Sequence, residues 1–529
     1  MICFIPAWYA ENEWTENEQI WYTRRMHTEV DDTVKQLQLF DRKSEFTSQT
    51  LLLHYAPNYR HFLHRQGLLH SKYWSLFDVI QNIKVKRPAI LSFHDLAWPE
   101  NVEFIYSPFD VIAMRGNEKY ATIEFGEDGN MIQIDLFQGN ELRRRNIYDD
   151  RGFMSSTTVF REGKWSYRQY LDEKGIWRIC QYSDGHVDVN SNAKEYSIAM
   201  DGIEYAYSFK KQKYDTLEEV IEEVFANYVK LVKEDNIYCV AMHPQHSLLL
   251  SHVLKDKKTI LSFYNDRCYP QKDSGSLELV KQAKYIIANS KNVIISIGLK
   301  DISTVSPVID ITPFDSRVDF GNSLQIKEQN ILVTVDHLED EMFEKMIVVL
   351  MQYMQKNSAA RVNLFTRNAT WNMEDQLLTK TQHFLEKNGY SSEYAIKEMH
   401  QAQENQLEEP LPILFVVRQC VDELSVSKCL REQRIVVDME LNPDLFLQIS
   451  AISMGVPQIV RKQTDYVIDG KNGRVVQDIP DLEKVLGYYL DTLKHWNEAM
   501  IESYEIGKKF TSDSLVKQWE GVIAYVQQS

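Results

Sequence analysis

The run 441–474 constrains the fold of this 529-residue chain more than any other part of its sequence. Asn442 and Asp444 are residue types that cap helices, and the apolar residues after them recur with helical spacing until Gly455. A short apolar run over 456–460 then predicts a buried strand, and the two glycines of residues 469–473 permit a tight turn. Helix and strand alternating in this way are typical of an α/β unit with a parallel sheet.

The same run resembles the second Rossmann-like domain of GT-B glycosyltransferases, where a pattern of the form E-x7-E, A-x-x-x-G-x-P and D-G-x-N-G lines the sugar-nucleotide cleft. The residues that shape the backbone match this pattern: Ala451, Gly455, Pro457, Gly470, Asn472 and Gly473. The two carboxylates of the pattern fall at Asn442 and Ser450, which carry no charge. The resemblance therefore implies the GT-B architecture with degenerate catalytic positions.

A second departure concerns the positive charge that a GT-B enzyme places against its leaving diphosphate. In the family pattern G-R-L-x-x-x-K an arginine and a lysine supply it, and here His337 and Met342 occupy these positions. The carboxylates around them are Asp336, Glu339, Asp340 and Glu341. At an effective dielectric constant near 20, each like-charge contact at ~4 Å opposes anion binding by about 4 kcal/mol. We expect that a sugar nucleotide does not bind by the usual route.

The loop after the first predicted strand, residues 6–9, contains no glycine, although nucleotide-binding Rossmann units use glycines there to approach phosphate. The three departures together favour a protein that kept the GT-B shape and lost transfer activity, because site chemistry decides function. We expect no enzyme activity and no cofactor. Four histidines have spacings compatible with a metal site, but no cysteine or carboxylate matches them, so we predict no metal. They are His61, His64, His243 and His246.

Composition narrows the class of partner and the compartment. The net charge of -17 argues against a nucleic-acid partner and makes any contact with anionic lipid a local one. The basic cluster that we name as a candidate membrane contact is Lys210, Lys211 and Lys213. The six cysteines lack C-x-x-C spacing, and the first residues form neither a basic start nor a long apolar run. We expect a cytoplasmic protein with reduced thiols.

The sequence is rich in glycine between Gly116 and Gly202, where nine of the twenty glycines lie. Alternating apolar and polar residues and Asp-Gly turns predict antiparallel hairpins there. We therefore predict an α/β, GT-B-like fold with two Rossmann-like domains and an antiparallel β-sheet inserted in the first. The first domain is expected over 1–115 and 214–312, the insertion over 116–213, and the second domain over 313–529. The last helix, around Trp519 and Ile523, is expected to return to the first domain.

Five further residues are candidate contacts for a ligand or a partner. His94 and Asp95 follow a strand predicted over 89–93 and resemble a His-Asp pair near the acceptor side of some GT-B enzymes. Trp165, Tyr167 and Trp177 offer aromatic faces that suit a sugar or a protein surface. The alternative for each is structural: a strand-end histidine bonded to its own loop, or an aromatic side chain in the core.

The opening sequence FIPAWY, the run 148–153 of the insertion and the degenerate GT-B tail together resemble the first accessory secretory proteins of the accessory Sec system, found in streptococci and related Gram-positive bacteria. The resemblance spans nearly the whole chain. It implies a non-enzymatic protein that joins two other accessory secretory proteins. It further implies that they act with the accessory SecA motor ATPase to export a glycosylated serine-rich repeat adhesin.

Two alternatives stay open beside this interpretation. An active glycosyltransferase with an atypical donor site would use Arg461 or Lys462 as phosphate ligands. A protein held peripherally at the inner face of the cell membrane would use the three lysines named above, and this role is compatible with a scaffold.

Overall fold

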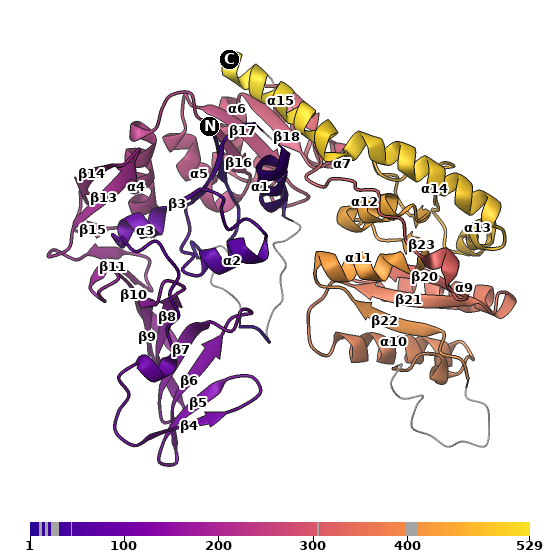
Figure 1. Ribbon diagram of the computed structural model, residues 1–529, viewed down its shortest axis with the longest axis horizontal. Coiled ribbons are helices and arrows are strands. Elements are labelled where there is room, and N and C mark those ends of the chain that lie inside the picture. Colours follow the sequence, from indigo (N-terminus) through magenta and orange to yellow (C-terminus); the bar gives the residue numbers. More distant parts are fainter. Residues whose placement is uncertain (10–12, 16–19, 23–30, 44, 304–305, 398–410) are drawn as a thin grey trace.

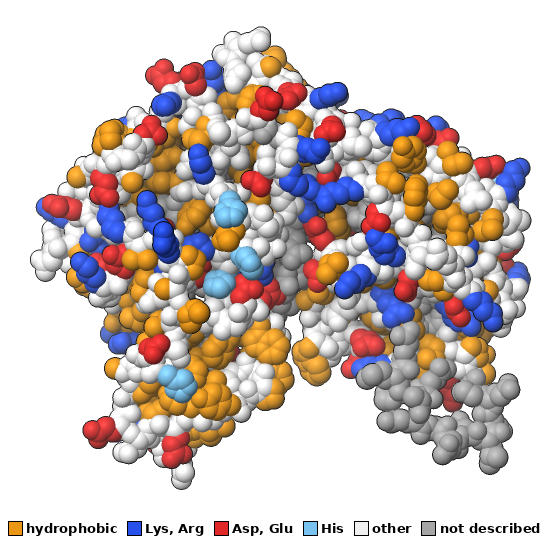
Figure 2. All heavy atoms as spheres, viewed as in Figure 1, with side chains coloured by type: hydrophobic (Ala, Val, Ile, Leu, Met, Phe, Trp, Pro, Cys, Tyr) orange, Lys and Arg blue, Asp and Glu red, His pale blue; other side chains and the backbone are white. Residues whose placement is uncertain are grey.

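The computed structural model describes residues 1–529 apart from 10–12, 16–19, 23–30, 44, 304–305 and 398–410. Two α/β lobes stand beside each other, and a long antiparallel sheet extends from the first lobe (Figure 1). The lobes touch in the upper part of the view and separate below it (Figure 2). The predicted fold class, two Rossmann-like lobes with an antiparallel sheet inserted in the first, is confirmed.

The first lobe is built on seven parallel strands in the order β19-β18-β17-β16-β1-β2-β3. Their bounds are β1 (Ile2–Ile5), β2 (Ser48–Leu52), β3 (Tyr73–Ser75), β16 (Ile237–Ala241), β17 (Lys258–Phe263), β18 (Tyr285–Ala288) and β19 (Val308–Asp310). Cys3 and Ile5 of β1 enter the core on one face, and Ile2 and Phe4 enter it on the other. Burial on both faces explains why this strand is an unbroken apolar run in the sequence.

Helices cover both faces of this sheet. They are α1 (Asp32–Lys43), α2 (Tyr59–Arg65), α3 (Leu76–Ile80), α4 (Leu217–Leu231), α5 (Pro244–Val253), α6 (Ser274–Gln282), α7 (Lys291–Ile297), α8 (Leu299–Ile302) and α15 (Ser512–Gln528). The ring of Trp519 on α15 packs edge-on against Phe4 and Phe40, with centroids 6.4 and 5.3 Å apart. The last helix of the chain thus covers the first sheet (Figure 1).

The second lobe has six parallel strands in the order β22-β21-β20-β23-β24-β25. Their bounds are β20 (Gln329–Thr334), β21 (Ala360–Thr366), β22 (Phe415–Gln419), β23 (Gln433–Asp438), β24 (Gln458–Val460) and β25 (Gly473–Val475). The helices are α9 (Asp340–Lys356), α10 (Met373–Lys387), α11 (Glu423–Arg431), α12 (Leu445–Met454), α13 (Pro480–Leu490) and α14 (Leu493–Gly507). Gly455 ends α12 with a φ of 72°, as the sequence predicts.

The inserted sheet has ten strands in the order β15-β12-β11-β10-β9-β8-β7-β6-β5-β4. They are β4 (Val102–Tyr106), β5 (Val111–Arg115), β6 (Glu118–Phe125), β7 (Met131–Gln138), β8 (Glu141–Asp149), β9 (Phe153–Arg161), β10 (Lys164–Leu171), β11 (Trp177–Tyr182), β12 (Val187–Val189) and β15 (Lys213–Tyr214). A separate hairpin joins β13 (Glu195–Met200) to β14 (Ile203–Ser208). The sheet begins before the predicted boundary at residue 116, since β4 and β5 already belong to it. Their turn is closed by Ser107 and Asp110 and contains no glycine, so the glycine pattern did not reveal it.

The strand predicted over 89–93 is wrong. These residues join no sheet, Ile90 is fully exposed, and the short 3-10 helix η2 (Phe93–Asp95) begins where the strand should end. The first sheet ends at β3, so an apolar run that follows it has no strand to pair with.

Candidate functional site

The two lobes meet where the carboxyl ends of strands from both parallel sheets come together. Tyr264, directly after β17, packs on Phe314, whose ring centroid lies 5.5 Å from that of Phe446 at the start of α12. Lys35 of α1 lies 5.8 Å from the centre of the same Phe446 ring and forms an ion pair with Glu423 at the start of α11. Ligands of α/β proteins bind at this edge of a sheet. We call these five residues the interlobe contact.

Two helices of the second lobe, α11 and α12, begin at the interlobe contact. A helix N-terminus attracts anions because its first N–H groups lack partners within the helix. Asp422 accepts a hydrogen bond from the backbone N–H of Ser425 at 2.7 Å, and Asp444 accepts one from Leu447 at 3.0 Å. Carboxylates of the chain itself therefore cap both helix N-termini.

Two arginines near the interlobe contact are already paired with carboxylates. Arg267 donates to the two carboxylate oxygens of Asp32 at 2.7 and 3.0 Å and to Asp31 at 3.2 Å. Arg367 lies 3.7 Å from Asp444, and its guanidinium carbon lies 5.5 Å from the centre of the Phe446 ring. The Arg267 guanidinium is thus held by hydrogen bonds to carboxylates, whereas the two buried Nη atoms of Arg367 donate no hydrogen bond to a described residue.

Sequence reasoning missed two buried carboxylates at the end of β23, Asp438, its last residue, and Glu440. Asp438 accepts a hydrogen bond from Thr334 Oγ1 at 3.1 Å, and Glu440 accepts one from the backbone N–H of His337 at 3.2 Å. Burial, reinforced by repulsion from Asp438, raises the pKa of Glu440 to about 8. Burial raises the pKa of Asp438 to about 6. Their position at the end of an apolar strand is the sequence signal that could have found them.

The four predicted degenerate positions lie near the starts of α9 and α12. Asn442 is exposed in the loop before α12, and Ser450 lies on that helix, half-buried. His337 is exposed after β20, and Met342 of α9 packs against the core of the second lobe. An apolar side chain at residue 342 therefore has a structural role that a lysine would not fill.

The carboxylates at the start of α9 contribute less repulsion than the sequence predicts. Asp340 forms an ion pair with Lys380 at 2.7 Å, and Glu341 forms one with Lys345 at 2.6 Å. Both partners belong to the second lobe. The negative charge that faces the interlobe contact comes instead from Asp422 and Asp444, which sequence reasoning had not identified as anion-site residues.

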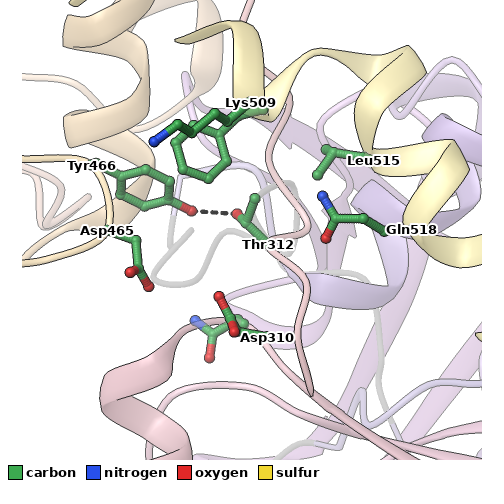
Figure 3. A pocket seen from close by; sticks show the side chains of 9 residues that line it. Asp310, Thr312, Asp465, Tyr466, Lys509, Leu515 and Gln518 are labelled. Carbon is green, nitrogen blue, oxygen red and sulfur yellow. Dashed lines mark hydrogen bonds between the residues drawn. The ribbon is translucent and has the colours of Figure 1, made fainter. Parts of the chain in front are cut away.

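A small cavity lies beside the segment that joins the lobes (Figure 3). Asp310, Thr312 and Asp465 line it, and the Tyr466 hydroxyl donates a hydrogen bond to Thr312 Oγ1 across it. Lys509, from the segment before α15, also lines it. Its volume of about 110 Å³ is smaller than the roughly 300–1,000 Å³ of ordinary ligand sites. A sugar nucleotide does not fit there.

His94 and Asp95 lie on the inserted sheet and not at a strand end of the first lobe. His94 Nε2 is 3.1 Å from the Tyr106 hydroxyl, and the Asp95 carboxylate accepts a hydrogen bond from the backbone N–H of Ser92 at 3.1 Å. Asp95 thus completes the capping box of η2 with Ser92.

The aromatic candidates of the insertion do not share one place on the sheet. Trp165 lies near the start of β10, and its ring lies 5.9 Å from the Arg168 guanidinium carbon. Tyr167 packs against Tyr182 with ring centroids 5.9 Å apart. Trp177 pairs with Leu171 at the far end of β10, roughly 20 Å away at ~3.3 Å per residue. One sugar ring cannot contact all three at this separation, and contact with a protein surface stays a prediction.

Histidines predicted not to bind metal serve other contacts. The buried His246 ring Nδ1 is 2.7 Å from the Tyr9 hydroxyl, and His61 Nδ1 is 3.0 Å from Asp128. Burial lowers the pKa of His243 to about 4. Within the described ranges, no three His, Cys, Asp or Glu side chains are arranged to hold a metal ion.

The three lysines of the candidate membrane contact are exposed beside β15. Lys211 pairs with Glu219 at 2.9 Å and lies over the Tyr214 ring, so its charge is partly neutralised. Lys210 and Lys213 form no ion pair with any described residue. Across the part of the chain that the structure describes, no helix has the length and apolar content to cross a bilayer.

The fold is similar to those of several solved structures. The chain superimposes on a component of the Glycosylation Associate Protein (Gap123) complex from Streptococcus agalactiae with a TM-score of 0.80 at 28% identity, covering 99% of this chain and 100% of that one. A chain from the crystal structure of accessory secretory protein 1, 2 and 3 in Streptococcus pneumoniae gives 0.79 at 28% identity, with both chains covered completely. The pneumococcal O-GlcNAc transferase GtfA shares the fold, with a TM-score of 0.69 at 12% identity over 100% of this chain and 99% of that one.

Sequence comparison agrees. The accessory Sec system protein of Staphylococcus aureus is 31% identical over 532 residues, and that of Streptococcus gordonii is 30% identical over 533, each with 98% of both chains covered. The family description that matches residues 1–525 is that of accessory secretory protein 1 of the accessory Sec system. The chain therefore belongs to the accessory secretory protein 1 family of the accessory Sec system, on a glycosyltransferase-like fold.

Proposed function

We propose that this protein is a non-catalytic scaffold of its accessory Sec system. It assembles with two other accessory secretory proteins and acts with the accessory SecA motor ATPase in the export of a glycosylated serine-rich repeat adhesin. It binds no sugar nucleotide and needs no cofactor. Its place of action is the cytoplasm, in part at the inner face of the membrane.

The observation that carries the proposal is the occupation of anion sites by the chain itself. Asp422 and Asp444 cap the two helices that begin at the interlobe contact. Arg267 forms an ion pair with Asp32, and Arg367 lies 3.7 Å from Asp444. A diphosphate at this edge would meet carboxylates that already accept hydrogen bonds from the helix N–H groups and from Arg267.

The proposal that this protein has partners is supported by solved structures of similar chains. One similar structure is titled as accessory secretory protein 1, 2 and 3, and another as a Gap123 complex, so relatives of this chain occur with other proteins. The SecA motor and the adhesin rest on the family resemblance alone.

The rival function is glycosyl transfer through an atypical donor site. Arg461 and Lys462 follow β24, and neither forms an ion pair with a described residue, so both remain available to a phosphate. Calorimetry with UDP-GlcNAc and UDP-glucose, beside a turnover assay on an acceptor peptide from the adhesin, separates the two functions. We expect no heat of binding and no product. Micromolar binding with turnover would overturn the scaffold proposal.

The membrane contact is a second part of the proposal. Lys210 and Lys213 keep their charge free for anionic lipid, whereas Lys211 is held by Glu219. We expect weak sedimentation with vesicles rich in anionic lipid at low salt. Sedimentation should be lost near 0.5 M salt, because salt then limits the attraction between charges to about a few ångströms. Equal sedimentation with neutral vesicles would contradict this contact.

A further inference from the structure

The inserted sheet ends in an open edge. β4 is its last strand and pairs only with β5. The backbone N–H of Ser107 bonds to Asp110 O at 3.0 Å, so alternation along the antiparallel pair turns the N–H and C=O groups of Val102, Phe104 and Tyr106 outward. No described residue makes a backbone hydrogen bond to these outward groups.

The side chains along this edge do not protect it. The strand Val-Glu-Phe-Ile-Tyr contains neither lysine nor proline, the residues with which proteins usually block such edges. Ile105, Tyr106 and Phe109 are exposed by 53%, 65% and 54%. Figure 2 shows apolar side chains gathered at the lower end of the inserted sheet, away from the lobes.

The edge is held in a fixed conformation. All five residues of β4 pair with β5 in one unbroken register. Beneath it, Phe104 packs on Phe93 with ring centroids 5.1 Å apart, in a core that includes Ala113 and Ile123. An incoming strand would therefore meet a template that requires little ordering.

Charge indicates what kind of strand fits. Residues 90–120 contain five Asp or Glu and two Lys or Arg. Asp95, Glu100 and Glu103 are exposed, and none of them forms an ion pair with a described residue. Arg115 is exposed at the end of β5, opposite Val102 of β4, and Lys119 lies over the Phe137 ring. The protein surface beside the β4 edge therefore carries net negative charge, which favours a cationic partner.

We propose that β4 is a docking edge for an extended strand of a second polypeptide, with alternating apolar residues flanked by lysine or arginine. Main-chain hydrogen bonds to Val102, Phe104 and Tyr106 supply affinity, and the exposed side chain of Ile105 and the acidic surroundings supply selectivity. A second copy of this chain fits less well, because pairing β4 with β4 would set one acidic tip against another. The inference rests on the proposed scaffold function, because the strand belongs to a partner in the complex.

The test measures binding of the full-length chain to the two other accessory secretory proteins of its own system. Tyr106→Pro removes an outward N–H without touching the β5 ladder, and Ile105→Lys adds a charge to the edge. Ile203→Lys is the matched control, because Ile203 lies on β14 and is exposed by 54%, close to the 53% of Ile105. Circular dichroism and thermal midpoints like those of the wild type show that each variant is folded.

We expect Kd to rise by about tenfold or more for Tyr106→Pro and Ile105→Lys and to stay unchanged for Ile203→Lys. Amide hydrogen exchange over 102–106 should slow in the wild-type complex. Unchanged affinity of both edge variants with unchanged exchange would overturn the docking edge and leave the scaffold function intact. A wild-type chain that binds neither protein would overturn both. A homodimer that Tyr106→Pro abolishes, with partner binding unchanged, would assign the edge to a second copy and overturn the proposal.

Discussion

The Asp444 carboxylate accepts a hydrogen bond from the backbone N–H of Leu447 at 3.0 Å and thereby closes the N-terminus of α12. The pair brackets Phe446 of the interlobe contact in the sequence. This side chain stabilises the helix, and it places a negative charge where a helix N-terminus would otherwise attract an anion.

Replacing Asp444 tests the first of these effects. Asp444→Ala deletes the cap, so we expect the free energy of unfolding to fall by about 1 kcal/mol in urea denaturation. Asp444→Asn keeps an oxygen acceptor for the Leu447 N–H and should retain most of the stability. If the alanine variant is as stable as the wild type, the cap has no energetic role.

The buried Glu440 should make stability fall as pH rises. Its pKa is about 8 in the folded protein against an ordinary value of 4.5. Between these pH values the unfolded chain releases the proton and the folded chain keeps it, so each step up in pH favours unfolding until about pH 8. Glu440→Gln cannot ionise, and its thermal midpoint should exceed that of the wild type by more at pH 8 than at pH 5. A difference that does not change with pH would contradict this.

The ion pair of Lys35 and Glu423 should couple the two lobes energetically. The Lys35 side chain is 8% exposed and that of Glu423 37%, so solvent screens this pair less than a pair in which both side chains are exposed. A double-mutant cycle with Lys35→Met and Glu423→Gln should give a coupling energy of about 0.5–3 kcal/mol. The pair Lys43 and Asp513, with side chains 49% and 75% exposed, is the control and should give a value near zero. Equal coupling for both pairs would remove the special role of Lys35.

Gly455 should tolerate a side chain less well than Gly129. Both have positive φ, 72° and 75°, so alanine pays about 1–2 kcal/mol of backbone strain at either position. A Cβ at Gly455 would also lie 2.7 Å from Met500 Cγ and 3.2 Å from the Phe320 ring, whereas nothing lies within 4 Å at Gly129. We expect Gly455→Ala to lose roughly 1–3 kcal/mol more than Gly129→Ala in denaturant titrations. Equal losses would mean that Met500 moves aside without cost.

Predictions that depend on neighbours in the sequence agree with the structure best. The cap at Asp444 and the left-handed glycine that ends α12 involve residues within one or two turns, so spacing alone identifies them. The strand predicted over 89–93 is wrong because a strand exists only where a partner strand is available, and the first sheet ends at β3. β4 and β5 were not predicted, because their turn has no glycine and their pairing depends on strands that follow later in the chain.

The sequence by itself determined the helices, strands and turns of the second lobe around 441–474, and the absence of charge at Asn442 and Ser450. Only the tertiary structure decided which carboxylates are neutralised by ion pairs and which are buried or link the two lobes. Asp340 and Glu341 pair with lysines of their own lobe, while Glu440 is buried and Glu423 meets Lys35 from the other lobe. The reason is physical: a charge acts through its burial and its nearest partner, and both are set by segments far apart in the chain.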